Sequence, residues 1–193
     1  MEVIRVRDLV ATPWKNGGGV TRQIAAGPPD ADFANFDWRL SLAIVEAGGP
    51  FSTFPGVDRL MLILDGELEL EMAGATPSRL TAHDSALEFP GDAPVAAATP
   101  SAPVTDINVM VRRGLYTSSL ERRRAEPNAA VVSQDVTFIL ACNEGLALAH
   151  GADNRRLDFG DVARIEAARG ALVRVRADAP TEFVVAHVNA VRG

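Results

Sequence analysis

A lysine, an asparagine and three glycines follow one another at residues 15–19 of this 193-residue chain. Three adjacent glycines let a backbone approach a ligand closely and turn its N–H groups toward an anion. The lysine and asparagine add a compact ammonium and an amide. A phosphate P-loop is excluded, because the lysine precedes the glycines and the Walker spacing is absent. The segment therefore predicts an anion-binding turn, and a flexible turn between strands is the alternative.

Lys15 is the only lysine among 19 basic residues, and the other 18 are arginines. Lysine differs from arginine in size, hydration and the ability to lose a proton. A lone lysine in an arginine-rich chain therefore indicates a position that requires a compact ammonium, with chance retention as the alternative. We expect its amine to point inward and to contact an anionic or carbonyl oxygen.

Two segments alternate polar and aliphatic residues, which is typical of strands with one polar face. The polar faces carry Arg39 and Ser41 in residues 37–43, and Asp106, Asn108 and Met110 in residues 106–111. A buried aspartate needs a cationic partner, and Lys15, Arg39 and Arg59 are the candidates. Asp58 and Arg59 add an acid–base pair at the expected mouth of a barrel. A solvent-facing strand side with one salt bridge fits the alternation equally well.

The rest of the chain predicts an all-β fold. Short aliphatic runs separated by Gly, Pro, Asp and Asn recur, and helical periodicity is scarce, which favours a sandwich or barrel. Gly-Asp turns recur in both halves, so we expect two related β modules packed as one compact unit. The expected organisation is a first module with the ligand pocket at residues 1–111, a crossover at 112–134 with a short helix near 118–124, and a second, smaller module at 135–193.

Composition excludes several classes of function. The formal net charge is −6, which argues against a nucleic-acid-binding surface. No run of 18 apolar residues and no signal-peptide pattern occurs, so we expect a cytoplasmic protein without a membrane segment. The single cysteine, Cys142, lies in an apolar run as a buried small residue would. A homodimer is an oligomeric state that the sequence leaves open.

The turn around Gly66 and the later Pro-Gly turn are arranged as in cupins, so the metal-ligand positions of a cupin can be tested. Counting from these turns places the ligand positions at Thr53, Pro55, Arg59 and Pro94. A guanidinium repels a divalent ion and proline has no donor atom. The three histidines, His83, His150 and His187, lack ligand spacing. The sequence therefore predicts no metal and no other cofactor.

Several motifs together resemble the HutD/Ves family: PWKNGGGVTRQI, FDWRLSLAIVEAGGPFSTFPGVDRLMLILDGELEL, EFPGD and TDINVMVRR. The resemblance covers most of residues 5–113 and implies a bicupin, two cupin-like jelly-roll β-barrel modules, without the cupin metal residues. It also implies a link to bacterial histidine utilisation, as a regulator or accessory protein rather than an established enzyme. The family pattern falls on the candidate ligand-binding residues Trp14, Lys15, Asn16, Gly17, Gly18, Thr21, Arg39, Ser41, Asp58, Arg59, Asp106, Asn108 and Met110. Gln23 stands where the family often has Glu, which argues against a general base there.

Two functional hypotheses follow. In the first, the chain binds a small carboxylate or formyl metabolite, held by Lys15, Arg39 or Arg59 and oriented by Asn16, Ser41 and Asn108. In the second, it is a metal-independent enzyme in which Lys15 acts as base or nucleophile and Asp106 orients it. Against the enzyme, no Cys or His falls inside the motif cluster. A pure interaction scaffold would leave the polar strand faces without a role.

Overall fold

The computed structural model describes residues 1–192 and contains strands and one short 3-10 helix, η1 (Val6–Asp8). The chain is organised as two units. The first module is Val10–Tyr116, and the second module combines Met1–Leu9 with the chain from Thr117 onward. Among residues 1–192, no helix has the length and apolar character that a membrane span requires.

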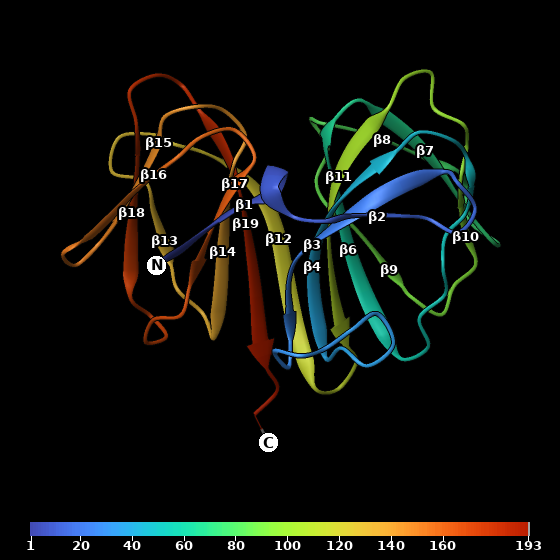
Figure 1. The fold of residues 1–193 in the computed structure, drawn as a ribbon, viewed down its shortest axis with the longest axis horizontal. Coiled ribbons are helices and arrows are strands. Elements are labelled where there is room, and N and C mark those ends of the chain that lie inside the picture. The colour runs from blue at the N-terminus through green and yellow to red at the C-terminus, as the bar shows by residue number, and fades with distance from the viewer. Residues whose placement is uncertain (193) are drawn as a thin grey trace. The chain divides into compact units, whose positions relative to one another are not determined.

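In each module a larger sheet faces a smaller one (Figure 1). The larger sheet of the first module has the order β2 (Ala11–Pro13), β3 (Gly19–Gly27), β4 (Trp38–Val45), β11 (Val104–Arg112), β6 (Val57–Asp65), β9 (Leu87–Pro90). Its smaller sheet has the order β5 (Gly49–Pro50), β10 (Val95–Ala97), β7 (Glu67–Met72), β8 (Ser78–Thr81). Aliphatic side chains of both sheets, among them Val45, Met61, Leu68 and Leu70, form the core between them.

The second module repeats this plan. Its larger sheet has the order β1 (Glu2–Arg5), β17 (Asp161–Ile165), β14 (Val136–Ala141), β19 (Glu182–Ala190), β12 (Tyr116–Arg124). Its smaller sheet has the order β13 (Ala130–Val132), β18 (Leu172–Ala177), β15 (Leu146–His150), β16 (Asp153–Leu157). Alternate residues of each strand point inward and form an aliphatic and aromatic cluster between these sheets, with buried Thr137 and Asp161 beside it.

Two parts of the chain differ from the sequence prediction. The segment expected to hold a short helix is strand β12, which lies at the end of its sheet. An edge strand has only one neighbour, so Ser, Glu and Arg side chains are tolerated there. The N-terminal strand β1 pairs with β17, and its residues therefore lie in the second module instead of the first. The choice of a partner so distant in sequence is not encoded in local alternation.

Candidate functional site in the first module

Strand pairing brings the polar faces of β4, β11 and β6 together. Arg39 pairs with Met110, and Met110 pairs with Arg59 on its other side, so the three lie in one row. Ser41 and Asn108 pair in the next row, and Asp106 lies one row further along β11. Successive residues of a strand point to opposite faces, so all of these side chains share the face that packs toward the smaller sheet. The predicted assignment of residues to strand faces is thus correct. The structure adds that the polar side of β4 and the polar side of β11 lie next to each other in one sheet.

The guanidinium of Arg59 is enclosed by aromatic rings. Its central carbon lies 4.8 Å from the ring centre of Phe89, 5.5 Å from Phe51 and 5.8 Å from Phe54. Phe89 is its partner on β9, and the other two rings come from the loop before β6. Arg59 is only 8% exposed, and its Nε has no hydrogen-bond partner within the described part of the chain. Burial lowers its pKa to about 10, with Asp106 opposing and Arg39 adding to the shift. The ring faces favour a cation here, but they do not satisfy its N–H donor.

Asp106 is the buried acid of the site. It is 2% exposed, and its Oδ1 has no hydrogen-bond partner among residues 1–192. Burial raises its pKa to about 7, while the positive charge of Arg59 acts in the opposite direction. Arg59 is therefore the cation that acts on Asp106, although no direct ion pair joins the two within the described chain. Near neutral pH the carboxyl group is divided between its charged and neutral forms.

Asn108, Ser41 and Arg39 complete the buried polar face. Asn108 is 6% exposed, and its Oδ1 also has no hydrogen-bond partner among the residues described. Arg39 donates a hydrogen bond from Nε to Oε1 of Gln23 (2.9 Å), and its guanidinium lies 5.2 Å from the ring centre of Phe33. Burial lowers the pKa of Arg39. Arg39 is shielded from solvent, whereas its hydrogen-bond partner Gln23 is exposed. The buried polar face therefore reaches solvent at Gln23.

The three glycines form a structured turn instead of an anion nest. Gly17 N–H donates to the carbonyl of Trp14 (3.0 Å), and Gly18 N–H donates to Oδ1 of Asn16 (3.0 Å). The carbonyl of Gly18 accepts hydrogen bonds from two residues that follow β4. A Cβ on Gly19 would lie 2.2 Å from the carbonyl oxygen of Ile44. The expectation of inward-turned N–H groups at Gly17 and Gly18 is therefore wrong, because the turn uses those donors itself.

Trp14 and Thr21 support the turn. The indole Nε1–H of Trp14 donates to Oγ1 of Thr21 (2.7 Å), and the indole meets the ring of Phe51 edge to face with centroids 6.0 Å apart. The Trp14 side chain also packs against the core of the first module. Both residues are thus involved in holding the loop onto the barrel.

Lys15 is exposed and makes no hydrogen bond or ion pair within residues 1–192. The expectation that its amine points inward is not met, and of the three candidate partners of Asp106, Lys15 does not pair with it in the described chain. The backbone around Lys15 is held by hydrogen bonds from Trp14 N–H to the carbonyl of Gly19 (2.9 Å) and from Gly17 N–H to the carbonyl of Trp14 (3.0 Å).

Asp58 belongs to a different network. Its Oδ1 accepts a hydrogen bond from Nε of Arg113 (2.8 Å), and Arg113 also pairs with Asp92 (2.9 Å). The other carboxylate oxygen of Asp92 accepts the N–H of Gly56 (2.9 Å). Asp58 and Arg59 are neighbours on β6 and point to opposite faces, so the predicted acid–base pair does not form. The hydrogen bonds to Gly56 and Arg113 lower the pKa of Asp92, and the network ties the turn before β6 to the end of β11.

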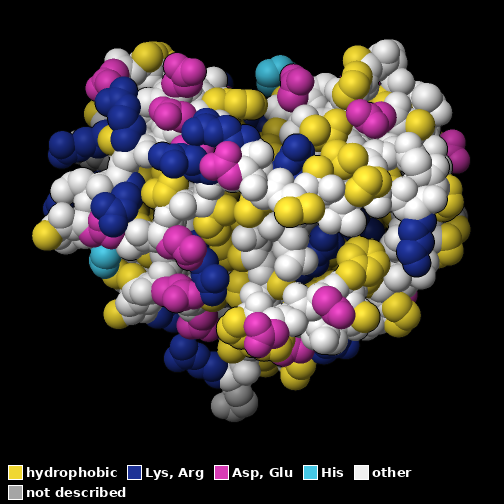
Figure 2. All heavy atoms as spheres, in the orientation of Figure 1, with side chains coloured by type: hydrophobic (Ala, Val, Ile, Leu, Met, Phe, Trp, Pro, Cys, Tyr) yellow, Lys and Arg dark blue, Asp and Glu magenta, His cyan; other side chains and the backbone are white. Residues whose placement is uncertain are grey.

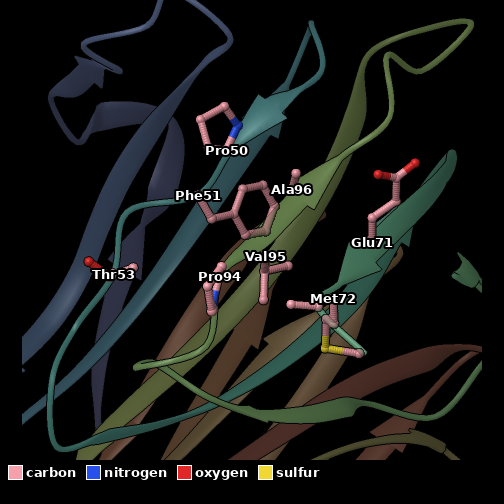
Figure 3. A pocket seen from close by; sticks show the side chains of 9 residues that line it. Pro50, Phe51, Thr53, Glu71, Met72, Pro94, Val95 and Ala96 are labelled. Atoms are coloured by element: carbon pink, nitrogen blue, oxygen red, sulfur yellow. The ribbon is translucent and has the colours of Figure 1, made fainter. Parts of the chain in front are cut away.

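A surface hollow of about 390 Å³ lies elsewhere on the first module (Figure 3). Its lining includes Phe51, Thr53, Glu71, Met72 and Pro94, but none of the predicted ligand-binding residues. Phe51 is the link between the two places, because the same ring approaches Arg59. Apart from this ring, the hollow and the buried polar face share none of these residues and are separate features.

The side chains at the metal-ligand positions of a cupin do not fit a divalent ion. Thr53 and Pro94 line the surface hollow, and Arg59 occupies the carboxylate position inside its ring of phenylalanines. No group of three or more His, Cys, Asp or Glu suited to a metal occurs among the described residues. At the position that the sequence count gives to the carboxylate ligand, this chain therefore has a cation. Elemental analysis remains the check on the predicted absence of metal.

Sequence reasoning missed the phenylalanines that enclose the two arginines, Phe33, Phe51, Phe54 and Phe89. A signal existed, because four of the eight phenylalanines lie at residues 33–54. Phenylalanines usually pack in the hydrophobic core. Only the fold shows that these rings lie beside Arg39 of β4 and Arg59 of β6.

Comparison with known proteins decides the family. The HutD family model matches residues 6–184. The chain belongs to the HutD family. An uncharacterised 21.2 kDa protein from the region 3′ of hutC in Pseudomonas putida is 28% identical over 166 residues, which are 86% of this chain and 87% of that protein. Protein Ves of Citrobacter koseri is 37% identical over 115 residues, 58% of this chain and 59% of Ves.

Solved structures confirm the all-β bicupin fold of this HutD-family chain. A conserved Pseudomonas aeruginosa protein of unknown function superimposes with a TM-score of 0.87 at 28% identity, over 97% of this chain and 98% of that one. HutD from Pseudomonas fluorescens gives 0.84 at 23% identity, over 100% and 99%. A variant of Bacillus subtilis oxalate decarboxylase gives 0.69 at 7% identity, over 99% and 78%, which shows the shared cupin fold alone.

Proposed function

We propose that this HutD-family protein binds a small carboxylate or formyl metabolite in the first module without a metal. The observation that carries the proposal is that three of the buried polar atoms without partners in the described first module lie on the adjoining strands β6 and β11: Nε of Arg59, Oδ1 of Asp106 and Oδ1 of Asn108. Each such atom costs about 1–3 kcal/mol if it stays unsatisfied. Three of them on adjoining strands favour a site that a bound molecule completes.

The charges favour an anion. Arg59 and Arg39 lie in one row on either side of Met110, and Asp106 is the only buried acid of the described first module. A carboxylate or formyl oxygen accepts the free N–H of Arg59 in a charge-assisted hydrogen bond. Asn108 and Ser41 then orient the remainder of the ligand, and neutral Asp106 can donate a proton to a second oxygen.

Within the cell, the proposed role is a regulatory or accessory one in the cytoplasm of bacteria that use histidine. Its support is the family membership and the likeness to the protein encoded near hutC. The breakdown of histidine offers ligands of the right chemistry: urocanate, formylated or formimino glutamate, and formate. The enzyme hypothesis has no comparable support, because Lys15 is exposed and Asp106 has no pairing with it.

A thermal-shift screen against these four ligands tests the proposal. A ligand present at 100 times its dissociation constant should stabilise the protein by about 2.7 kcal/mol. Arg59→Met keeps much of the side-chain volume and removes the charge, so the shift should disappear while the protein still unfolds cooperatively.

Arg7→Met is the matched control. It removes the same charge from an exposed residue, whose side chain is 62% accessible, and should leave the ligand shift unchanged. A full ligand shift in folded Arg59→Met would refute the proposed site, and no shift with any ligand of this class in the parent protein would refute the ligand class.

A further inference from the structure

Strands β7 and β18 have the same design with opposite charge. Residues 67–72 read Glu-Leu-Glu-Leu-Glu-Met, and residues 172–177 read Leu-Val-Arg-Val-Arg-Ala. Both strands have the same alternation of exposed and buried positions, ending in a half-buried residue. In each case the aliphatic side chains enter the core of their own module. The charged side chains therefore stand on the outer face of the smaller sheet.

The outer face of the first module's smaller sheet is acidic. Glu67, Glu69 and Glu71 follow one another on β7, and Arg79 on β8 pairs with Glu67. Within residues 1–192, Glu69 and Glu71 have no ion-pair partner closer than 4 Å. Beyond Glu71 the face ends in the surface hollow, whose walls include the ring of Phe51 and the side chains of Met72 and Val95 (Figure 3).

The outer face of the second module's smaller sheet is basic. Arg174 and Arg176 point outward from β18, opposite Ala149 and Ala147 of β15. Neither arginine has an ion pair in the described chain, whereas the neighbouring Arg156 pairs with Asp178 (3.3 Å). Before Arg174 the face begins with an apolar cross-strand pair, Leu172 (60% exposed) and Val132 (47% exposed).

The charges on the acidic face of β7 and on the basic face of β18 are complementary when the two strands run antiparallel to each other. Residues two apart on a strand are separated by about 6.7 Å, so Glu69 and Glu71 have the spacing of Arg176 and Arg174. With that register, Leu172 lies over the hollow beyond Glu71. Ala147 and Ala149 lie opposite Arg176 and Arg174 and leave space for long partners there. On the acidic face Ala96 lies opposite Glu71, and Arg79, which pairs with Glu67, lies opposite Glu69.

The distribution of charge over the chain supports the same pairing. The first module holds 13 acidic and 7 basic residues, and the rest of the chain holds 12 of each, so the whole net charge of −6 belongs to the first module. In the space-filling view, arginine side chains are frequent over the second module, interspersed with Asp and Glu (Figure 2). Faces of opposite sign attract each other and exclude contacts between like faces.

We propose that the acidic face of β7 binds the basic face of β18 of a second copy of this chain. Glu71 and Glu69 pair with the partner's Arg174 and Arg176, and the hollow receives the partner's Leu172. Because the two faces are different patches, the contact is heterologous and repeats from copy to copy unless a ring closes. It differs in this from the homodimer that the sequence left open, which would use one patch twice.

Sedimentation velocity over a range of concentrations tests this contact. In about 50 mM salt the weight-average sedimentation coefficient should rise with concentration, and raising the salt to about 500 mM should weaken association by about tenfold or more, since exposed charges are then screened. Glu69→Arg with Glu71→Arg should abolish self-association, and Arg174→Glu with Arg176→Glu should do the same.

Mixing the two charge-reversed proteins is the decisive step. Each has two faces of one sign, so neither associates alone, but an equimolar mixture should recover association between different molecules. Leu172→Ser should weaken association by about the same factor at both salt concentrations, because it removes only apolar contact. Each variant alters exposed side chains, so thermal unfolding should remain within a few degrees of the parent.

Glu46→Arg with Glu88→Arg is the control, because it makes the same change in net charge at exposed positions of the first module outside the acidic face. The control should associate like the parent. The contact is excluded if the parent stays monomeric at every concentration and salt, if the face variants associate like the parent, or if the mixture fails to recover association.

Discussion

The two modules share one plan of sheets but differ in what fills them. In the second module the core residues, from Val131 to Val185, are aliphatic or aromatic and at most 1% exposed. In the first module the larger sheet directs two arginines, an aspartate, an asparagine and a serine into the corresponding space. The second barrel is filled by an apolar cluster, and its buried Asp161 accepts the N–H of Asp158 (3.2 Å), whereas the first barrel also buries two arginines.

The buried polar groups differ in the same way. In the second module Ser133 donates to the carbonyl of Ala168 (2.8 Å), Thr137 accepts from the N–H of Gln134 (2.9 Å), and Thr181 donates to the carbonyl of Ala179 (2.8 Å). These groups are satisfied by the fold itself. In the first module Arg59, Asp106 and Asn108 each keep an unpartnered atom within the described chain. A buried polar group therefore points to a candidate site where the fold leaves it incomplete and where several such groups adjoin, as those of Arg59, Asp106 and Asn108 do.

The largest effect should come from the apolar module. Phe183 is fully buried in its core, so Phe183→Ala should lower the free energy of unfolding by about 3–5 kcal/mol in urea denaturation. Phe159→Ala is the matched control, because Phe159 is 67% exposed and should change stability by less than about 0.5 kcal/mol. Equal effects of the two substitutions would contradict the assignment of stability to this core.

The next effect concerns the acid of the polar module. The pKa of Asp106 rises from 3.8 to about 7 on folding. Between pH 3.8 and about pH 7, Asp106 is therefore mostly protonated in the native state and mostly ionised in the unfolded chain. Its contribution to stability is therefore complete below pH 4 and is lost as pH rises to about 7. The upper bound of the loss is roughly 4 kcal/mol, at about 1.4 kcal/mol per unit of pKa.

Comparing the parent with Asp106→Asn over pH 4–8 measures this contribution, because Asn cannot titrate. The parent should lose stability relative to the variant as pH rises through this range. Binding of a carboxylate by the parent should also weaken between pH 6 and 8, since ionised Asp106 repels an anion. Parallel stability curves for the two proteins would show that Asp106 does not titrate in this window.

Much of the fold could be predicted from alternation alone. The alternating segment at residues 37–43 overlaps β4, and the one at 106–111 lies within β11. Period-two patterns are local, so they identify strands and their faces. Pairing is not local, and neither the union of β1 with β17 nor the position of β12 at a sheet edge is visible in a short window.

The site was predicted in the same uneven way. The position of Arg39, Ser41, Asp106, Asn108 and Met110 on one face of the sheet could be predicted because their strands alternate. The glycine turn misled the prediction, because hydrogen bonds inside the turn and the close approach of Gly19 to Ile44 explain its composition without a ligand. Residue type predicts what a side chain can do, and only packing decides whether its donors are already used.

The smallest effect should come from Lys15, and it separates the turn from the buried face. A Lys15 amine that contacts an anionic oxygen, as its residue type suggests, would make Lys15→Met weaken carboxylate binding by about 1.5–3 kcal/mol, the strength of a charge-assisted hydrogen bond. Because the side chain is exposed and unpaired in the described structure, we now expect less than about 0.5 kcal/mol in either binding or stability. Isothermal titration of Lys15→Met beside Arg59→Met, with the same ligand, distinguishes the two expectations. A loss for Lys15→Met as large as that for Arg59→Met would place the loop amine at the ligand and return the glycine turn to the site.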